Sequence, residues 1–268
     1  MYLHQIWFDL GMGSKPPGSN GISSMLEYAD ASGLLYKLWS EEAADLLICT
    51  LPGRVQHVWN NLPHKINKID FFRYILLYKF GGAYFDVDFH CVNELSELLR
   101  DHIAFLCEEW PFSYKNGSLH NGVLICKSAG HPLWMDVISE VESRLTLLKN
   151  NECKDIQKSV FQLTGTAMLR DVASNYLYNH DLSNTWWPLV VLPFGFFCPL
   201  ICGGSKENTE SKESKESKES EQYIDSYDLK DKKLICLKAP SQANIDSHAR
   251  CFTLGYLSAS VKIWQRMF

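Results

Sequence analysis

The stretch KIDFFRYILLYKFGGAYFDVD, from Lys68 to Asp88, decides the fold. Together with the residues just before it, its first part (65–80) has apolar side chains at helical spacing on nearly all sides, which predicts a buried helix. Gly81 and Gly82 follow, and glycine commonly ends a helix because it adopts the left-handed backbone conformation without steric penalty. The next residues, 83–89, predict a buried strand that is apolar apart from two carboxylates.

Outward from this stretch, strand and helix patterns alternate along the chain. Short apolar runs rich in branched and aromatic residues predict strands, and longer runs with helical spacing predict helices. Such alternation indicates an α/β fold with a mixed or mainly parallel sheet. Further strands are expected at 3–8, 34–39, 119–126, 189–192 and 233–237, and further helices at 40–47, 132–149 and 166–179.

Length and composition limit the possible classes of protein. The 268 residues are expected to form a single domain, 1–268, because α/β domains often reach this size. A hydrophobic fraction of 46% allows a sizeable core and excludes a disordered or collagen-like chain. The net charge of −5 argues against the broad basic field of a nucleic-acid-binding protein, so no nucleic-acid partner is expected. A phosphorylated small molecule needs only a local positive site and stays open as a ligand.

Three features bear on location and on the shape of the domain. Residues 205–221 repeat Ser-Lys-Glu without an apolar side chain, so a disordered insertion is expected at about 203–222. The first residues lack the apolar run of a signal peptide, and three prolines interrupt the apolar segment 186–202, which argues against a transmembrane segment. The nine cysteines show no Cys-x-x-Cys spacing and are expected to be thiols in a reducing compartment. We therefore expect a soluble, cytoplasmic protein.

Two pairs of charged residues stand in the apolar stretch 68–88. Asp86 and Asp88 are two residues apart, so in a strand both side chains point to the same face. Close carboxylates in an apolar setting repel each other, and a hard divalent cation removes that cost and can bridge to phosphate oxygens. Asp70 and Arg73 are three residues apart in the predicted helix and share a face. Either pair alone is common on protein surfaces, but this segment is too apolar for a surface, which indicates a functional site.

This combination of motifs resembles glycosyltransferase family 32, the DXD-motif sugar transferases that include fungal α-mannosyltransferases and bacterial capsule enzymes. That family shows Asp-x-x-Arg-Tyr, a helix, Gly-Gly-x-Tyr and then Asp-x-Asp. Segments 4–7, 120–124, 130–134, 163–166 and 192–199 resemble the family in the same order, although Thr166 and Cys198 replace a usual proline and tyrosine. The residues that match the central motif are Asp70, Arg73, Tyr74, Gly81, Gly82, Tyr84, Asp86 and Asp88.

The resemblance implies a fold and a reaction. The fold would be a Rossmann-like nucleotide-diphospho-sugar transferase domain of GT-A type, with a mixed central sheet flanked by helices. The reaction would be the metal-dependent, retaining transfer of a hexose, mannose among the candidates. The donor would be a UDP- or GDP-hexose, and the acceptor would be a hydroxyl of a glycan, a lipid or a protein. A lipid acceptor would place the protein at the periphery of a membrane.

The resemblance also implies roles for individual residues. Asp88 would bind Mn²⁺ or Mg²⁺ directly, and Asp86 would bind the ribose or reach the metal through water. His248, near the end of the chain, would be a third metal ligand, although the sequence around it fits the family only in part. Trp7 would stack on the nucleotide base. The residues expected to hold the donor sugar are Asp70, Arg73 and Asn121.

Two alternative interpretations stay open. A phosphatase of the Asp-x-Asp type would use Asp86 as its nucleophile. That pattern has Thr or Val two residues after the second Asp, where this chain has His90. A non-catalytic descendant of the same fold would serve as a carbohydrate-binding or interaction module. The intact set of four charged residues in the central motif favours the enzyme.

Overall fold

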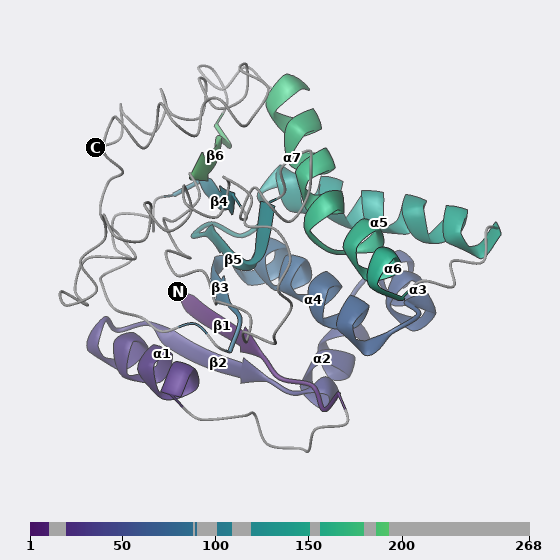
Figure 1. Cartoon of the computed structure of the whole chain (residues 1–268). Helices are drawn as coiled ribbons and strands as arrows, with labels where there is room; N and C mark the ends of the chain where they lie inside the picture. Colours follow the sequence, from purple (N-terminus) through teal and green to yellow (C-terminus); the bar gives the residue numbers. More distant parts are fainter. Residues whose placement is uncertain are drawn as a thin grey trace, which may run out of the picture.

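A six-stranded mixed sheet forms the centre of the computed structural model, which describes residues 1–10, 20–87, 89, 101–108, 119–150, 156–179 and 186–192. The strands are β1 (Tyr2–Ile6), β2 (Leu35–Trp39), β3 (Gly82–Phe85), β4 (Ala104–Glu108), β5 (Leu119–Cys126) and β6 (Leu189–Leu192). They lie in the order β2-β1-β3-β5-β4-β6 (Figure 1). Within this sheet β5 is antiparallel to both of its neighbours, and the other pairs are parallel.

Helices flank the sheet on both faces. They are α1 (Asn20–Ala31), α2 (Glu41–Ile48), α3 (Gly53–Asn61), α4 (Lys65–Phe80), α5 (Pro132–Asn150), α6 (Ile156–Leu163) and α7 (Thr166–Asn179). On one face, side chains from α2 to α7 pack against the sheet in the larger hydrophobic core. Helix α1 lies on the other face (Figure 1). Its Met25 packs in a second cluster with Leu3 and Val123. The expected α/β class, with a mixed sheet and flanking helices, is confirmed.

The elements expected from the sequence are found, with one important change of boundary. The predicted strand 83–89 ends earlier, because β3 stops at Phe85. The Asp86 carbonyl accepts hydrogen bonds from the backbone N–H of Phe89 at 3.1 Å and from Gln5 Nε2 at 3.1 Å, so the chain turns there. The prediction that Asp86 stands within a strand is therefore wrong. Asp88 lies outside the described residues.

The structure also contains elements that the sequence patterns missed. They are three helices, α1, α3 and α6, and one strand, β4. The helix expected at 40–47 is confirmed as α2, and Ser40 caps it by accepting a hydrogen bond from the backbone N–H of Ala43 at 3.2 Å. The strand expected at 233–237 and the insertion expected at 203–222 lie outside the described residues.

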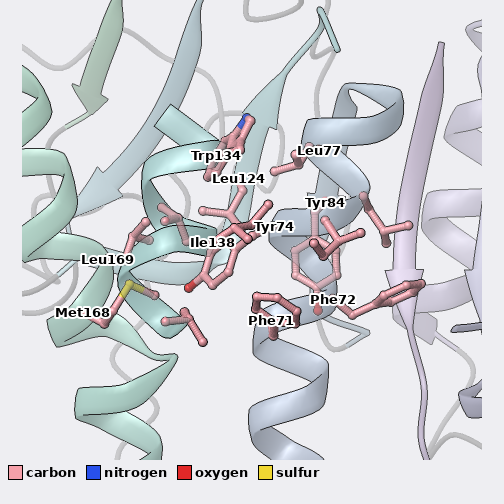
Figure 2. Close-up of a cluster of buried hydrophobic side chains, with 14 of the residues drawn as sticks. Phe71, Phe72, Tyr74, Leu77, Tyr84, Leu124, Trp134, Ile138, Met168 and Leu169 are labelled. Atoms are coloured by element: carbon pink, nitrogen blue, oxygen red, sulfur yellow. The ribbon is translucent and has the colours of Figure 1, made fainter. Parts of the chain in front are cut away.

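Helix α4 is the centre of the larger core. Phe71, Phe72 and Leu77 are fully buried on it, as is Tyr74, whose ring stacks on Trp134 of α5 at a centroid distance of 6.1 Å (Figure 2). A helix that is apolar on nearly all sides is stable only when other elements surround it, as the sequence pattern predicted. This packing fixes the position and rotation of α4, and with it the two charged residues that α4 carries.

The turn from α4 to β3 requires two glycines. Gly81 and Gly82 have φ angles of +64° and +99°, which side chains other than hydrogen rarely allow. A Cβ atom at Gly82 would also overlap the backbone carbonyl of Tyr2, and one at Gly81 would overlap the carbonyl of Lys127. The two glycines thus let β3 pair closely beside β1 directly after the helix ends.

His4 is buried at the centre of β1 and is held in one tautomer. Its Nδ1 accepts a hydrogen bond from Trp39 Nε1 at 3.2 Å, and its Nε2 lies 3.0 Å from the Gly81 carbonyl. Because Nδ1 accepts, the proton resides on Nε2, which donates to the carbonyl. Burial lowers the pKa of His4 to about 4, outweighing the hydrogen bond to Gly81, which raises it. The folded protein therefore holds His4 neutral.

Acidification is expected to remove the stability that neutral His4 provides. The pKa of His4 is lower in the folded than in the unfolded chain, so this stability is present above about pH 6.5 and is lost as the pH falls toward about 4. Urea unfolding at pH 7 and pH 4 should show that the stability gap between the parent and His4→Gln shrinks by up to about 3 kcal/mol. The same substitution at exposed His57 is the control, and a gap that does not change with pH would contradict the assignment.

Candidate active site

A buried ion pair on α4 is the first part of the site. Asp70 and Arg73 are 4% and 3% exposed, and Arg73 Nη2 lies 2.9 Å from Asp70 Oδ1. The predicted common face of these two residues is confirmed. Burying two charges costs several kcal/mol of desolvation free energy, which only good pairing and further hydrogen bonds offset. The surroundings supply those bonds.

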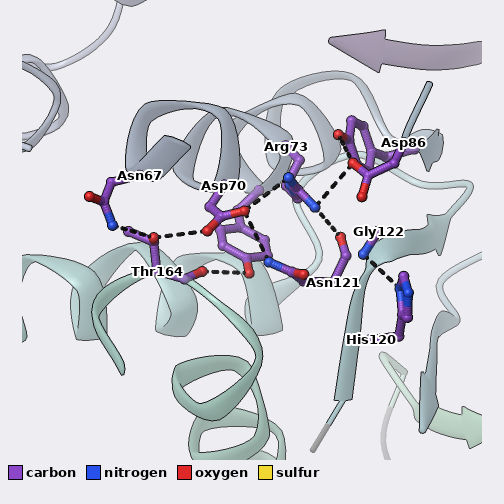
Figure 3. A network of polar contacts seen from close by, with 10 residues as sticks. Asn67, Asp70, Arg73, Asp86, His120, Asn121, Gly122 and Thr164 are labelled. Carbon is purple, nitrogen blue, oxygen red and sulfur yellow. Dashed lines mark hydrogen bonds and ion pairs between the residues drawn. The ribbon is translucent and has the colours of Figure 1, made fainter. Parts of the chain in front are cut away.

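Arg73 joins α4 to the ends of two strands. Its Nη1 donates to the backbone carbonyl of Asn121 in β5 at 2.6 Å and lies 3.4 Å from Asp86 Oδ1, just past β3 (Figure 3). Its guanidinium also stands over the ring of Tyr84 at 4.7 Å, a cation–π contact. Burial lowers the pKa of Arg73, but the carboxylate of Asp86 and the other neighbours outweigh it and raise this pKa overall. Arg73 is therefore a permanent cation between two carboxylates.

Asp70 receives hydrogen bonds from two further segments. Asn121 Nδ2 donates to Oδ1 at 3.1 Å, and the Thr164 hydroxyl, just after α6, donates to Oδ2 at 3.0 Å (Figure 3). Asn67 Nδ2 donates in turn to that hydroxyl at 2.9 Å, and the Tyr74 hydroxyl donates to the Thr164 carbonyl at 2.9 Å. Burial raises the pKa of Asp70 to about 6, although Arg73 and these hydrogen bonds lower it.

Asp86 is the most accessible carboxylate of the cluster. Its side chain is 34% exposed. Its Oδ1 accepts a hydrogen bond from the Tyr84 hydroxyl at 2.5 Å and faces Arg73. Its Oδ2 accepts no hydrogen bond from the described residues. A carboxylate oxygen in this state suits a hard divalent cation such as Mn²⁺ or Mg²⁺.

An irregularity in β5 places Asn121. Where β4 and β5 pair, Phe105 lies opposite Ile125, but Cys107 lies opposite His120. One residue of β4 thus faces four residues of β5, and such bulges turn side chains out of the regular alternation. Here the bulge brings the Asn121 carbonyl to Arg73 and its amide to Asp70.

The structure brings together four of the seven residues predicted for the site, namely Asp70, Arg73, Asp86 and Asn121. Trp7 follows β1 and donates its backbone N–H to the Trp39 carbonyl at 2.9 Å. No hydrogen bond or ion pair joins its side chain to the described part of the cluster. Asp88 and His248 lie outside the described residues. Among the described residues, no three His, Cys, Asp or Glu side chains gather closely enough to hold a metal ion.

Two further residues of the site have only weak signals in the sequence. Thr164 stood only in a segment resembling the family, and its hydroxyl proves to link α4 to the loop after α6. Gln5 accepts a hydrogen bond from the Tyr36 hydroxyl at 2.8 Å and supports the Asp86 carbonyl. Nothing in a single chain marks such partners, because they lie far apart in sequence.

Part of the chain matches a known family model. Residues 25–105, which include Asp70, Arg73 and Asp86, match the family model described as "Glycosyltransferase sugar-binding region containing DXD motif". These residues are thus similar to the sugar-binding region of DXD-motif glycosyltransferases. The mixed α/β sheet is consistent with the GT-A type that the resemblance implies. Asn121 and Thr164 lie beyond the match, so the hydrogen-bond network extends past the matched region.

Two curated relatives are similar to part of this chain. Inositol phosphoceramide mannosyltransferase 1 of Schizosaccharomyces pombe is 29% identical over 115 residues, which are 42% of this chain and 35% of the relative. Inositol phosphoceramide mannosyltransferase 3 of the same organism is 29% identical over 103 residues, which are 38% of this chain and 27% of the relative. The match thus spans about a third of the length of these relatives.

A solved structure is also similar in part. The PaToxG glycosyltransferase superposes with a TM-score of 0.45 and 13% sequence identity, over 66% of this chain and 74% of that chain.

Among the described helices, none is both long and apolar enough to cross a membrane. The expected cytoplasmic location and the single domain 1–268 stay predictions.

The hydrogen bond from Thr164 should help to determine the pH at which Asp70 becomes protonated. Asp70 is expected to become protonated below about pH 6, and hydrolysis of a sugar donor, the activity proposed below, would then fall. Thr164→Val removes a hydrogen bond that favours ionised Asp70, so the acid limb of the pH–rate profile should move up by about one pH unit. Thr164→Ser should restore it, and Thr146→Val, at an exposed position of α5, is the control. An unmoved limb would show that Asp70 does not control it.

Proposed function

We propose that this protein transfers a hexose from a nucleoside-diphosphate sugar to an acceptor hydroxyl, with Mn²⁺ or Mg²⁺ as cofactor. The observation that carries the proposal is the buried Asp70–Arg73–Asp86 network inside the region that matches the DXD glycosyltransferases. A charged cluster this buried costs folding stability, and a binding function explains why the chain retains it.

The proposal assigns the metal to the carboxylates after β3. Asp86 would contribute its accessible Oδ2, and Asp88 would contribute a second carboxylate, with His248 as the candidate third ligand. When bound, the cation would supply positive charge where the leaving diphosphate gains negative charge. The described carboxylates Asp70 and Asp86 outweigh the single charge of Arg73, so the cluster favours a cation.

The donor sugar would lie against Asp70 and Asn121. Asp70 is only 4% exposed and accepts hydrogen bonds from Asn121 and Thr164, so a sugar hydroxyl would use the remaining lone pairs of its carboxylate. The Asn121 amide can donate or accept. Arg73 is 3% exposed, and both of its terminal nitrogens contact protein groups. We therefore assign Arg73 a positioning role, which holds Asp70, Asp86 and the β5 bulge in place, instead of the direct sugar contact that the family resemblance implies. Trp7 keeps its proposed role of stacking on the base.

Mannose is the hexose we propose first, and a lipid with an inositol phosphate headgroup is the acceptor class we propose first. Both follow from the names of the two relatives, which act on inositol phosphoceramide and transfer mannose by those names. A lipid acceptor would bring the protein to a membrane surface. Glycan and protein acceptors are the alternatives that an acceptor screen would compare.

A donor screen tests the proposal. The full chain would be incubated with each UDP- and GDP-hexose, with Mn²⁺ and with EDTA, and release of the nucleoside diphosphate would be measured. Mn²⁺-dependent hydrolysis of one donor supports the transferase. Sugar binding without metal and without hydrolysis would instead support a carbohydrate-binding module, and phosphate release from aryl phosphates would support the phosphatase.

A further inference from the structure

His120 lies beside the carboxylate cluster and has no role in the proposed function so far. It precedes Asn121 in β5 and is half-buried. Its Nδ1 accepts a hydrogen bond from the backbone N–H of Gly122 at 2.9 Å (Figure 3). A Cβ atom at Gly122 would overlap both Asp86 Oδ2 and His120 Cε1. The imidazole and the accessible carboxylate oxygen therefore lie close together over the space that glycine leaves open.

Consecutive residues of β5 serve the two ends of the cluster. The Asn121 amide contacts Asp70, at the end assigned to the donor sugar. The His120 ring lies near Asp86, and its plane is nearly perpendicular to that of Phe89, at a centroid distance of 5.6 Å. Since Phe89 belongs to the turn that follows Asp86, His120 lies at the end assigned to the metal and the diphosphate.

The contact with Gly122 fixes the tautomer of His120. A nitrogen that accepts a hydrogen bond from a backbone N–H carries no proton, so the proton of the neutral ring is on Nε2. Histidines that bind a metal through one nitrogen usually donate a proton from the other. In His120 the other nitrogen is an acceptor, so this geometry disfavours a metal ligand and provides an N–H donor.

We propose that His120 donates a hydrogen bond from Nε2 to a diphosphate oxygen of the nucleotide sugar and does not bind the metal. The inference rests on the proposed function, because it concerns the leaving group of that reaction. A neutral donor can stabilise the diphosphate as its charge grows without forming an ion pair with Asp86, whose carboxylate stays available to the cation. His120 would thus act with the metal on the same group.

Two substitutions of His120 distinguish its proposed hydrogen bond to the diphosphate from its hydrogen bond with the Gly122 backbone. Asparagine places its amide near the Nδ1 position, so His120→Asn keeps an acceptor for the Gly122 N–H but has no group at the Nε2 position. Glutamine reaches the Nε2 position with an amide N–H, so His120→Gln keeps the donor. Exposed His57 on α3 provides the control, His57→Asn. Binding of uridine diphosphate and of guanosine diphosphate would be measured by calorimetry on the full chain with Mn²⁺, and binding of Mn²⁺ alone would be measured separately.

The inference predicts that His120→Asn weakens nucleoside-diphosphate binding about tenfold or more, while His120→Gln stays within about threefold of the parent. Binding of Mn²⁺ alone should be the same in all variants. Three results would overturn the inference. In the first, His120→Asn binds the nucleoside diphosphate as tightly as the parent; in the second, both variants lose the same affinity for it. In the third, His120→Asn binds Mn²⁺ alone more weakly than the parent does. If the parent binds neither nucleoside diphosphate, the proposed function itself fails, which is a different result from a failure of the variants.

Discussion

Arg73→Met should lower the free energy of unfolding by about 3–5 kcal/mol and abolish transfer, because removing one partner of a buried ion pair leaves an uncompensated charge. Arg73 is the described cation between Asp70 and Asp86 and lowers the pKa of Asp70, which is about 6 in its presence. Its loss would raise this pKa further, so at pH 7 the buried carboxyl either carries an uncompensated charge or must take up a proton. Urea unfolding at pH 7 measures the loss of stability. At pH 5, where Asp70 is mostly protonated, the loss should be smaller.

The control for this substitution is Arg54→Met. Arg54, like Arg73, pairs with a carboxylate, here that of Glu142, but the Arg54 side chain is 54% exposed. Replacing Arg54 should therefore cost less than about 1 kcal/mol. The double variant Asp70→Asn and Arg73→Met removes both members of the buried pair and should recover part of the lost stability. A cost for Arg73→Met no larger than that for Arg54→Met would mean that the buried cluster is not electrostatically coupled.

Asp86→Asn should reduce donor hydrolysis about a hundredfold or more while leaving the fold intact, because a neutral amide is a far weaker ligand for a divalent cation. The Asn side chain can still accept the hydrogen bond from the Tyr84 hydroxyl, so local packing is kept. Asp88→Asn should have an effect at least as large, since this residue is the proposed direct ligand. Hydrolysis of the active donor with Mn²⁺, together with thermal unfolding, measures both effects.

Exposed Asp30 on α1 provides the matched control, and Asp30→Asn should leave hydrolysis and unfolding unchanged. Activity of Asp86→Asn within a few-fold of the parent would place the metal elsewhere. A large drop in the unfolding temperature of Asp86→Asn would mean that this carboxylate acts mainly as a partner of Arg73.

Helix α4 and the turn and strand that follow it were predictable because their sequence signal is local. The apolar pattern of 65–80, the two glycines and the following apolar run predict α4, the turn and β3 without knowledge of the rest of the chain. The pairing of Asp70 with Arg73 followed from helical spacing alone. The helices α1, α3 and α6 and the short strand β4 were missed, because their tertiary contacts, and not their local patterns, define them.

The details of the site depended on contacts that a single sequence does not reveal. The early end of β3 at Phe85 follows from hydrogen bonds made by Gln5 and Phe89 to the Asp86 carbonyl. The burial of Arg73 beneath its partners, which changes its proposed role, follows from the bulge that brings Asn121 to it. Residue types were enough to identify the charged groups, but their partners had to come from the folded chain.

The partners of Asp70 also determine when the site can form as the chain is made. Asn121 and Thr164 follow Asp70 by 51 and 94 positions. At a synthesis rate of about 5–20 residues per second, Thr164 would leave the ribosome roughly 5–20 s after Asp70. During that interval the nascent chain holds the aspartate and arginine of α4 without the groups that later surround them. The hydrogen bonds that surround Asp70 can therefore form only after Asn121 and Thr164 have been made, well after α4 itself.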